Sequence, residues 1–107
     1  MQGILIVDKP AGFTSFDVVA KLRGICKTRK IGHSGTLDPM ATGVLPVFIG
    51  GAAKAVDMQQ NTDKAYDAVM LLGRRTDTGD VTGETLEEEP LPPNLDEAAV
   101  RQVLDRF

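Results

Sequence analysis

The sequence contains few of the residues that form disulfides or hold metals. Its 107 residues include one cysteine, one histidine and no tryptophan. A single cysteine cannot form a disulfide within the chain, and a structural zinc site needs four nitrogen or sulfur ligands. We therefore expect no disulfide, no metal centre and a reducing, cytoplasmic setting.

Long apolar segments are also absent. The longest runs, ILIV and VMLL, are far shorter than the roughly 20 residues that a membrane-spanning helix needs. The first residues show neither a basic leader nor a small-residue cleavage site, so no signal peptide is predicted. A hydrophobic content of 42% and a charged content of 25% are typical of one soluble domain. We expect no membrane partner.

Charge is distributed unevenly along the chain. Residues 1–75 carry ten Lys or Arg and six Asp or Glu, whereas residues 76–107 carry two and nine. A basic run without any acid consists of Lys21, Arg23, Lys27, Arg29 and Lys30. Such a run is either a solvated helix face or a phosphate-binding patch. The net charge of −3 argues against a free-standing, non-specific nucleic-acid binder.

The hydrophobic pattern predicts alternating strands and helices. Strands are expected over residues 3–10, 44–50 and 64–73, and helices over residues 15–27, 51–62 and 95–107. The segment 74–84 is rich in turn residues, and an acidic, proline-rich connector follows it up to residue 94.

Particular residues indicate where these elements begin and how they pair. Thr14 and Asp17 have the spacing of a capping box. Asn94, with Glu97 three positions later, is expected to cap the last helix. Pro46 lacks a backbone N–H and predicts an edge position or a bulge for its strand.

The stretch GHSGTLDPMATG, residues 32–43, surrounds one carboxylate, Asp38, with three glycines and a proline. Glycine lets a backbone turn sharply and approach a ligand closely, and Pro39 biases Asp38 towards extended geometry. A carboxylate held in this way can be aimed at a reacting atom with little entropic cost, as a nucleophile or a base. The same residues also suit an aspartate that only caps its own turn, so both interpretations remain open on composition.

Three other known motifs were compared with the sequence, and each matches it only in part. A phosphate-binding P-loop needs Gly-Lys-Ser/Thr after its glycines, and none follows here. The stretch DTGDVTGE lacks the alternating oxygen ligands and the sixth-position glycine of a calcium loop. Asp77-Thr78-Gly79 matches the triplet of aspartic proteases, but RRT precedes it instead of an apolar strand. We interpret this segment as a turn.

Three collinear stretches closely resemble TruB-type tRNA pseudouridine synthases. KIGHSGTLDPMATGVLPVFIG is similar to the catalytic segment, ILIVDKPAGFTSFDVV to the opening segment and DKAYDAVMLLGRRTDTGD to the next one. The likeness covers residues 3–83 and is weak beyond them. It implies an α/β (α+β) pseudouridine synthase fold, with a mixed, largely antiparallel sheet flanked by helices and an active site in a cleft across it. Residues 1–107 would be the N-terminal part of the catalytic domain.

The resemblance implies an isomerase that converts a T-loop uridine of tRNA, position 55 in tRNA numbering, to pseudouridine. Asp38 would be the catalytic carboxylate, attacking the base or the sugar while the glycosidic bond breaks. No metal or organic cofactor and no protein partner is implied, and the complete protein would be a cytoplasmic monomer. His33 would contact the RNA loop near the displaced nucleotide, and Tyr66 would stack on the flipped uracil.

Further residues are assigned supporting roles by the same resemblance. Gly32 would lie at the substrate, and Arg29, Lys30 and Lys54 are candidates for phosphate contacts. Arg74 and Arg75 either do the same or flank a turn. Lys9-Pro10 is interpreted as structural support for the loop, and Asp80 as a turn former.

The departure from the family is one of length. Its members continue with a second half of the catalytic domain, which supplies an arginine for the catalytic acid, and usually with an RNA-binding domain. We therefore expect little or no activity from residues 1–107 alone. A non-catalytic RNA-binding or assembly module on the same scaffold is the alternative. Within the enzyme class, MATGVLPVFIGGAAK resembles the stand-alone bacterial form more than the guide-RNA-dependent one.

Overall fold

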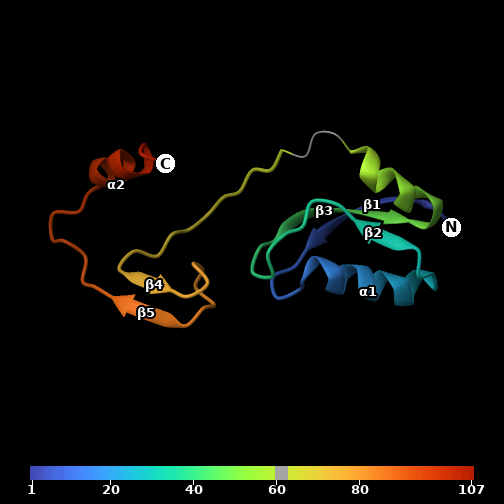
Figure 1. Cartoon of the computed structure of the whole chain (residues 1–107), viewed down its shortest axis with the longest axis horizontal. Coiled ribbons are helices and arrows are strands. Elements are labelled where there is room, and N and C mark those ends of the chain that lie inside the picture. The colour runs from blue at the N-terminus through green and yellow to red at the C-terminus, as the bar shows by residue number, and fades with distance from the viewer. Residues whose placement is uncertain (60–62) are drawn as a thin grey trace. The chain divides into compact units, whose positions relative to one another are not determined.

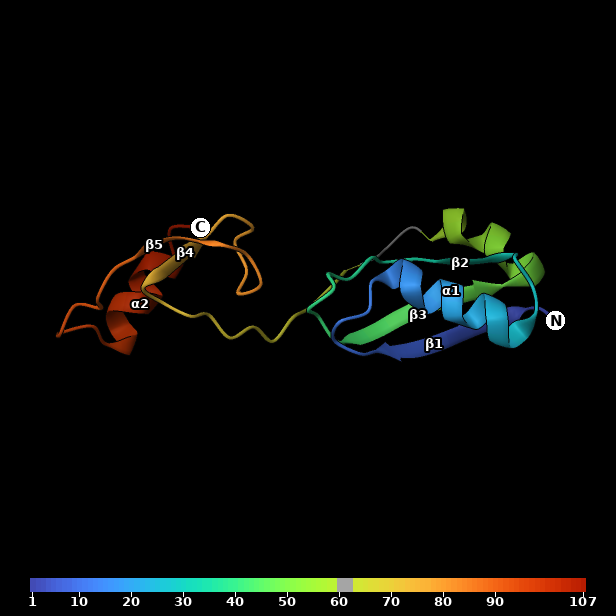
Figure 2. The same cartoon turned by 90° about the horizontal axis from the view of Figure 1, so that it is seen from below.

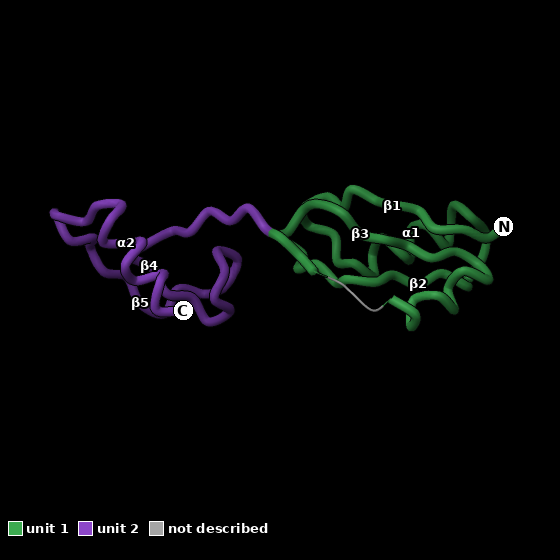
Figure 3. The backbone as a smooth tube through the Cα atoms, turned by 90° about the horizontal axis from the view of Figure 1, so that it is seen from above, with its two compact units in different colours: residues 1–65 green, residues 66–107 purple. Residues whose placement is uncertain are grey.

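The computed structural model describes residues 1–59 and 63–107 and contains two compact units, Met1–Ala65 and Tyr66–Phe107 (Figure 3). The first unit contains β1 (Gly3–Lys9), α1 (Ser15–Cys26), β2 (Ile31–His33), β3 (Gly43–Ile49) and the 3₁₀ helix η1 (Gly50–Met58) (Figure 1). The second contains β4 (Arg74–Thr76), β5 (Thr85–Glu88) and α2 (Glu97–Leu104). All strand pairs in the described ranges are antiparallel. The fold is of the α+β class, as expected.

The first unit is built on a three-stranded sheet in the order β1-β3-β2. Strand β1 pairs with β3 along its whole length, from Gly3 opposite Ile49 to Lys9 opposite Gly43. Strand β2 pairs with the last residues of β3, so that His33 lies opposite Val47. Helix α1 lies across one face of this sheet (Figures 1 and 2).

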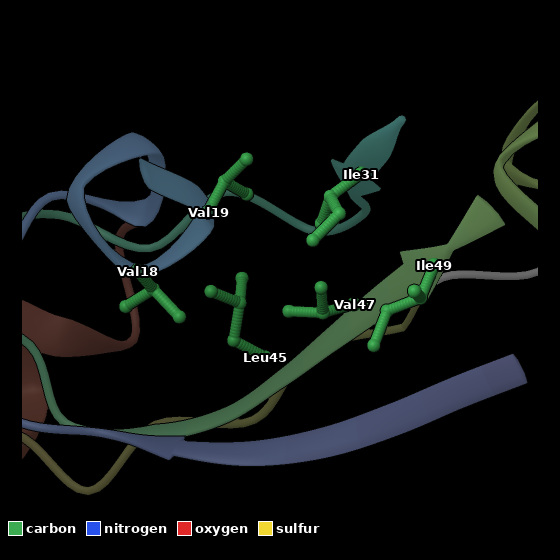
Figure 4. Close-up of a cluster of buried hydrophobic side chains, with 6 residues drawn as sticks. All are labelled: Val18, Val19, Ile31, Leu45, Val47 and Ile49. Carbon is green, nitrogen blue, oxygen red and sulfur yellow. The ribbon is translucent and has the colours of Figure 1, made fainter. Parts of the chain in front are cut away.

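The hydrophobic core lies between α1 and that face. Side chains of β3 alternate between the two faces of the sheet, and three of them point towards the helix (Figure 4). The buried cluster consists of Val18, Val19, Ile31, Leu45, Val47 and Ile49. Each fully buried side chain of this kind contributes about 1.5–3 kcal/mol. The core therefore joins helix and sheet into the frame that carries the loops between them.

Strand β3 was expected over residues 44–50 and is found at Gly43–Ile49, but the edge position or bulge expected from Pro46 is wrong, since β3 pairs with β1 in an unbroken register. β3 is the central strand of its sheet. The Pro46 carbonyl accepts a hydrogen bond from the Ser34 N–H at 3.1 Å, on the side of β2. In an antiparallel strand the nitrogen and the carbonyl of one residue point to the same side. The nitrogen therefore points beyond the end of β2, where no ladder bond is lost.

Helix α1 begins as expected and ends one residue early. The Thr14 hydroxyl accepts from the Asp17 N–H, and the Asp17 carboxylate accepts from the Thr14 N–H, each at 2.9 Å. This confirms the capping box. Lys27 takes a left-handed conformation with φ 52° and closes the helix. The helix expected at 51–62 is the 3₁₀ helix η1, and the last three positions of that expectation lie outside the described residues.

In the second unit, β4 and β5 form a hairpin. The turn expected at 74–84 is confirmed from residue 77 on, whereas Arg74–Thr76 is a strand, and Thr85–Glu88 is a strand and not part of a connector. Arg75 forms an ion pair with Glu87 at 3.1 Å. The Asp80 carboxylate accepts from the Thr82 hydroxyl and N–H at 2.6 and 2.8 Å, and from the Thr78 hydroxyl at 3.1 Å. Asp80 thus forms the turn, as expected.

Three further expectations are wrong. No strand forms over residues 64–73, because an alternating segment becomes a strand only where another strand pairs with it. The last helix is capped by Asp96, whose carboxylate accepts from the Ala99 N–H at 2.8 Å, and not by Asn94. That helix ends at Leu104. Within the described residues no helix is long and apolar enough to span a membrane.

Candidate active site

Asp38 lies in the loop that joins β2 to β3. Gly32 and His33, expected at the start of this loop, are the last residues of β2. The Asp38 side chain is exposed, and no ion pair of the described residues involves it. Its backbone carbonyl accepts from the Ala41 N–H at 3.0 Å. The loop therefore forms a local turn while it leaves the carboxylate open to a ligand.

The buried Lys9 supports the residue after Asp38. Lys9 is completely inaccessible to solvent, and its ammonium donates to the carbonyl oxygens of Pro10, Phe13 and Pro39 at 2.9, 2.5 and 3.2 Å. A buried charge is costly unless its hydrogen bonds are made, and three acceptors match the three donors of an ammonium. The Gly12 N–H adds a bond of 2.8 Å to the Pro39 carbonyl. The expected support of the loop by Lys9 is confirmed.

A second buried polar residue, Ser15, supports the residue before Asp38. The Ser15 hydroxyl accepts from the Leu37 N–H at 3.0 Å and donates to the Leu37 carbonyl at 3.3 Å. Ser15 and Leu37 are 3% and 7% exposed. Sequence reasoning missed both residues. The available signal was the helical spacing of Ser15 with Val18 and Val19, which places the serine on the buried face of α1.

Glycine is required by the backbone at two positions of the loop. Gly35 and Gly43 have φ values of 66° and 129°, in the left-handed region that other residues avoid. Gly32 differs, since a Cβ there would meet Val56 at 3.9 Å, an ordinary contact. Of the three glycines expected to make sharp turns, Gly35 and Gly43 do so and Gly32 does not.

His33 is half-buried at the end of β2, next to the loop. Its Nδ1 atom is buried and has no hydrogen-bond partner among the residues that the structure describes. An orphaned buried nitrogen is uncommon and costly. The expected contact of His33 with RNA is a prediction that the geometry leaves open.

The candidate phosphate contacts Arg29, Lys30 and Lys54 differ in exposure from Arg23, another member of the basic run. Arg29, Lys30 and Lys54 are exposed and take part in no ion pair within the described ranges. Arg23 is partly buried, donates to the Ile31 carbonyl at 3.3 Å and lies 5.7 Å from the Phe16 ring. Three of the candidate phosphate contacts are therefore available to an anion, whereas Arg23 holds α1 to β2.

The remaining candidates belong to the second unit. Tyr66 is its first residue, lies outside helices and strands, and is 56% exposed. Its stacking on a base remains a prediction. Arg74 donates to the Val81 carbonyl at 3.2 Å and Arg75 pairs with Glu87, so both residues hold the hairpin.

Comparison with known proteins identifies the family. Residues 23–107 match the model of the TruB family pseudouridylate synthases, N-terminal domain. The chain is 47% identical to tRNA pseudouridine synthase B of Bacillus subtilis (strain 168), over 98% of this chain and 34% of the relative. It is 53% identical to the protein of that name from Thermobifida fusca (strain YX), over 92% and 33%. The chain thus spans about a third of the length of these relatives. It belongs to the TruB family of pseudouridylate synthases.

Proposed function

We propose that the protein containing this chain isomerises a uridine in the T-loop of tRNA, at position 55, to pseudouridine, with Asp38 as the catalytic residue. The observation that carries the proposal is an exposed carboxylate between two anchored neighbours. Leu37 is bound by buried Ser15, and Pro39 by buried Lys9. Preorganisation of this kind is what a positioned nucleophile needs. The relatives named tRNA pseudouridine synthase B support tRNA as the class of substrate.

The reaction is an isomerisation that needs no oxidant or reductant. The nitrogen–carbon glycosidic bond breaks, a carbon–carbon bond to the uracil forms, the hydrogen of that carbon leaves as a proton, and the freed nitrogen is protonated. Asp38 is proposed to attack the base or the sugar while the glycosidic bond breaks. Loop residues that hold its backbone keep the carboxylate oriented during this attack.

The target nucleotide has to leave the base stack before Asp38 can reach it. Extrusion costs a few kcal/mol, and stacking on an aromatic ring returns about 1–3 kcal/mol. Tyr66, the only tyrosine of the chain, is proposed to supply this ring. His33 is proposed to contact the RNA near the displaced nucleotide, and Arg29, Lys30 and Lys54 to bind phosphates.

The test uses a chimaera in which residues 1–107 replace the matching third of the Bacillus subtilis relative. Activity is measured as tritium release from tRNA labelled at the uracil carbon that forms the new bond. Asp38→Asn keeps the size of the side chain and removes its charge. We expect tritium release to vanish while tRNA binding persists.

Two outcomes would contradict the proposal. Unchanged tritium release by Asp38→Asn would exclude Asp38 as the catalytic residue. A chimaera that binds tRNA but never forms pseudouridine would favour the alternative, a non-catalytic RNA-binding or assembly module. Asp17→Asn, in the capping box of α1, controls for a general effect of losing one carboxylate.

A further inference from the structure

Ser15 has an unusual use for a serine in the first turn of a helix. Serine there commonly caps its own helix, but that role belongs to Thr14 in α1. The Ser15 hydroxyl instead binds both backbone polar groups of Leu37, which lies 22 positions later in the chain. A single hydroxyl therefore joins the N-terminal end of α1 to the residue that precedes Asp38.

We propose that Ser15 is a positioning residue for the pseudouridine-forming reaction, which acts by fixing the backbone on the N-terminal side of Asp38. This inference rests on the proposed function. It assigns to α1 a role beyond packing: its first residue sets the direction from which the chain enters Asp38.

Ser15 holds only the residue before Asp38, and Lys9 holds the residue after it. The Pro39 carbonyl is held by the Lys9 ammonium and the Gly12 N–H. The residues on both sides of Asp38 are thus bound to other elements, and its own carbonyl accepts from the Ala41 N–H. If the Ser15 hydroxyl is removed, the Lys9 contact persists, but the loop gains freedom on its N-terminal side.

The loss would fall on turnover more than on substrate binding. Ser15 is 3% exposed, so it cannot touch RNA itself. Misplacement of a reacting group by about 1 Å costs up to roughly a hundredfold in rate. An interaction that matters only in the transition state lowers kcat and leaves KM unchanged.

The experiment compares Ser15→Ala with Thr14→Ala in the chimaera described above. Both substitutions remove a side-chain hydroxyl at the first turn of α1, but the hydroxyl of Thr14 bonds to Asp17 in the capping box and that of Ser15 to Leu37. We expect Ser15→Ala to lower kcat about ten- to a hundredfold with KM for tRNA within about twofold of the parent value. Thr14→Ala should destabilise α1 and leave kcat near that of the parent.

A second readout needs no activity. In the 107-residue chain, the Leu37 amide hydrogen should exchange with solvent faster in Ser15→Ala than in Thr14→Ala at equal global stability. If Ser15→Ala does not fold, Ser15→Cys replaces it, because a thiol keeps the shape but bonds weakly. Faster Leu37 exchange and lower kcat are expected of it too.

The contrary results separate a failure of the positioning role from a failure of the proposed function. Equal losses of kcat in the two alanine variants would show that Ser15 acts through helix stability and would overturn the positioning role. Parent-like kcat in Ser15→Ala, or unchanged Leu37 exchange, would overturn it as well. A parent chimaera without any turnover would overturn the proposed function, and the positioning role with it, even where Leu37 exchange responds.

Discussion

At the scale of single residues, two buried polar side chains carry the loop. Lys9 and Ser15 are the only buried polar or charged residues among those described. Ser15 makes both of its hydrogen bonds with backbone groups of Leu37, and Lys9 donates one of its three to the Pro39 carbonyl, so that both side chains hold a residue next to Asp38. Burial of polar groups costs stability unless they are bonded. Because their bonds hold the residues on either side of an exposed carboxylate, we infer that these two side chains are buried in order to fix the loop.

Replacing Lys9 by Met should destabilise the chain. The change leaves the Pro10 and Phe13 carbonyls without the ammonium, and bonds to a charged donor are worth about 1.5–3 kcal/mol. We expect the free energy of unfolding, measured by urea denaturation, to fall by roughly that amount. Lys54→Met is the matched control, because Lys54 is exposed. Equal stability of the two variants would refute a supporting role for the buried ammonium.

At the scale of elements, sequence patterns predicted the bounds of those helices and strands that depend on interactions between nearby residues. β1, α1 and β3 were placed to within one or two residues, because side-chain periodicity and the Thr14 cap act over a few positions. Two of the failures involve partners distant in sequence, whereas the cap of α2 is misplaced by two residues within its own turn. Residues 64–73 alternate as a strand does but have no neighbouring strand, and Pro46 fits a central strand only because β2 is short.

Prediction of the candidate site also succeeded for local features and failed for a contact made by tertiary packing. Asp38 could be singled out from its glycines, its proline and the family resemblance, and Lys9 could be linked to the loop. Ser15 could not, since its partner Leu37 is brought to it by the packing of α1 against the sheet. Sequence patterns therefore found the reacting group and one support, and tertiary structure was needed for the other.

The hairpin turn between β4 and β5 should respond to acid. Hydrogen bonds from Thr82 to the Asp80 carboxylate lower the pKa of Asp80 below its ordinary 3.8. The bond from the Thr82 hydroxyl has the larger effect and the bond from the Thr82 N–H the smaller. A carboxyl with a depressed folded-state pKa contributes stability above its unfolded pKa and loses it as the pH falls through the folded value. NMR titration should therefore show the turn intact at pH 5 and loosening only below about pH 4.

Thr82→Ala tests the cause of this shift. Without the hydroxyl, we expect the pKa of Asp80 to rise towards its ordinary value. Thr85→Ala is the control, since Thr85 lies in the same hairpin, within β5, and contributes nothing to the shift. Identical titration curves of Asp80 in the two variants would mean that the Thr82 hydroxyl does not stabilise the carboxylate.

At the scale of the whole molecule, charge divides the chain as the fold does. The first unit carries eight Lys or Arg and five Asp or Glu, with the candidate phosphate contacts among them. Residues 76–107 are strongly acidic. If the proposed function holds, we expect the RNA to be attracted to the unit that presents Asp38 and repelled by the acidic part of the other.

The isolated 107-residue chain should bind tRNA weakly and form no measurable pseudouridine. No cation forms an ion pair with Asp38 in the described residues, and charge developing at a reaction centre needs a preorganised partner. The chain spans about a third of its relatives, whose further residues are proposed to supply an arginine for that role. Tritium release is measured for the isolated chain and for the chimaera at equal concentration. Turnover by the chain alone, abolished by Asp38→Asn, would show that the carboxylate works without that partner. Turnover confined to the chimaera would show that residues which the relative contributes are needed for the reaction.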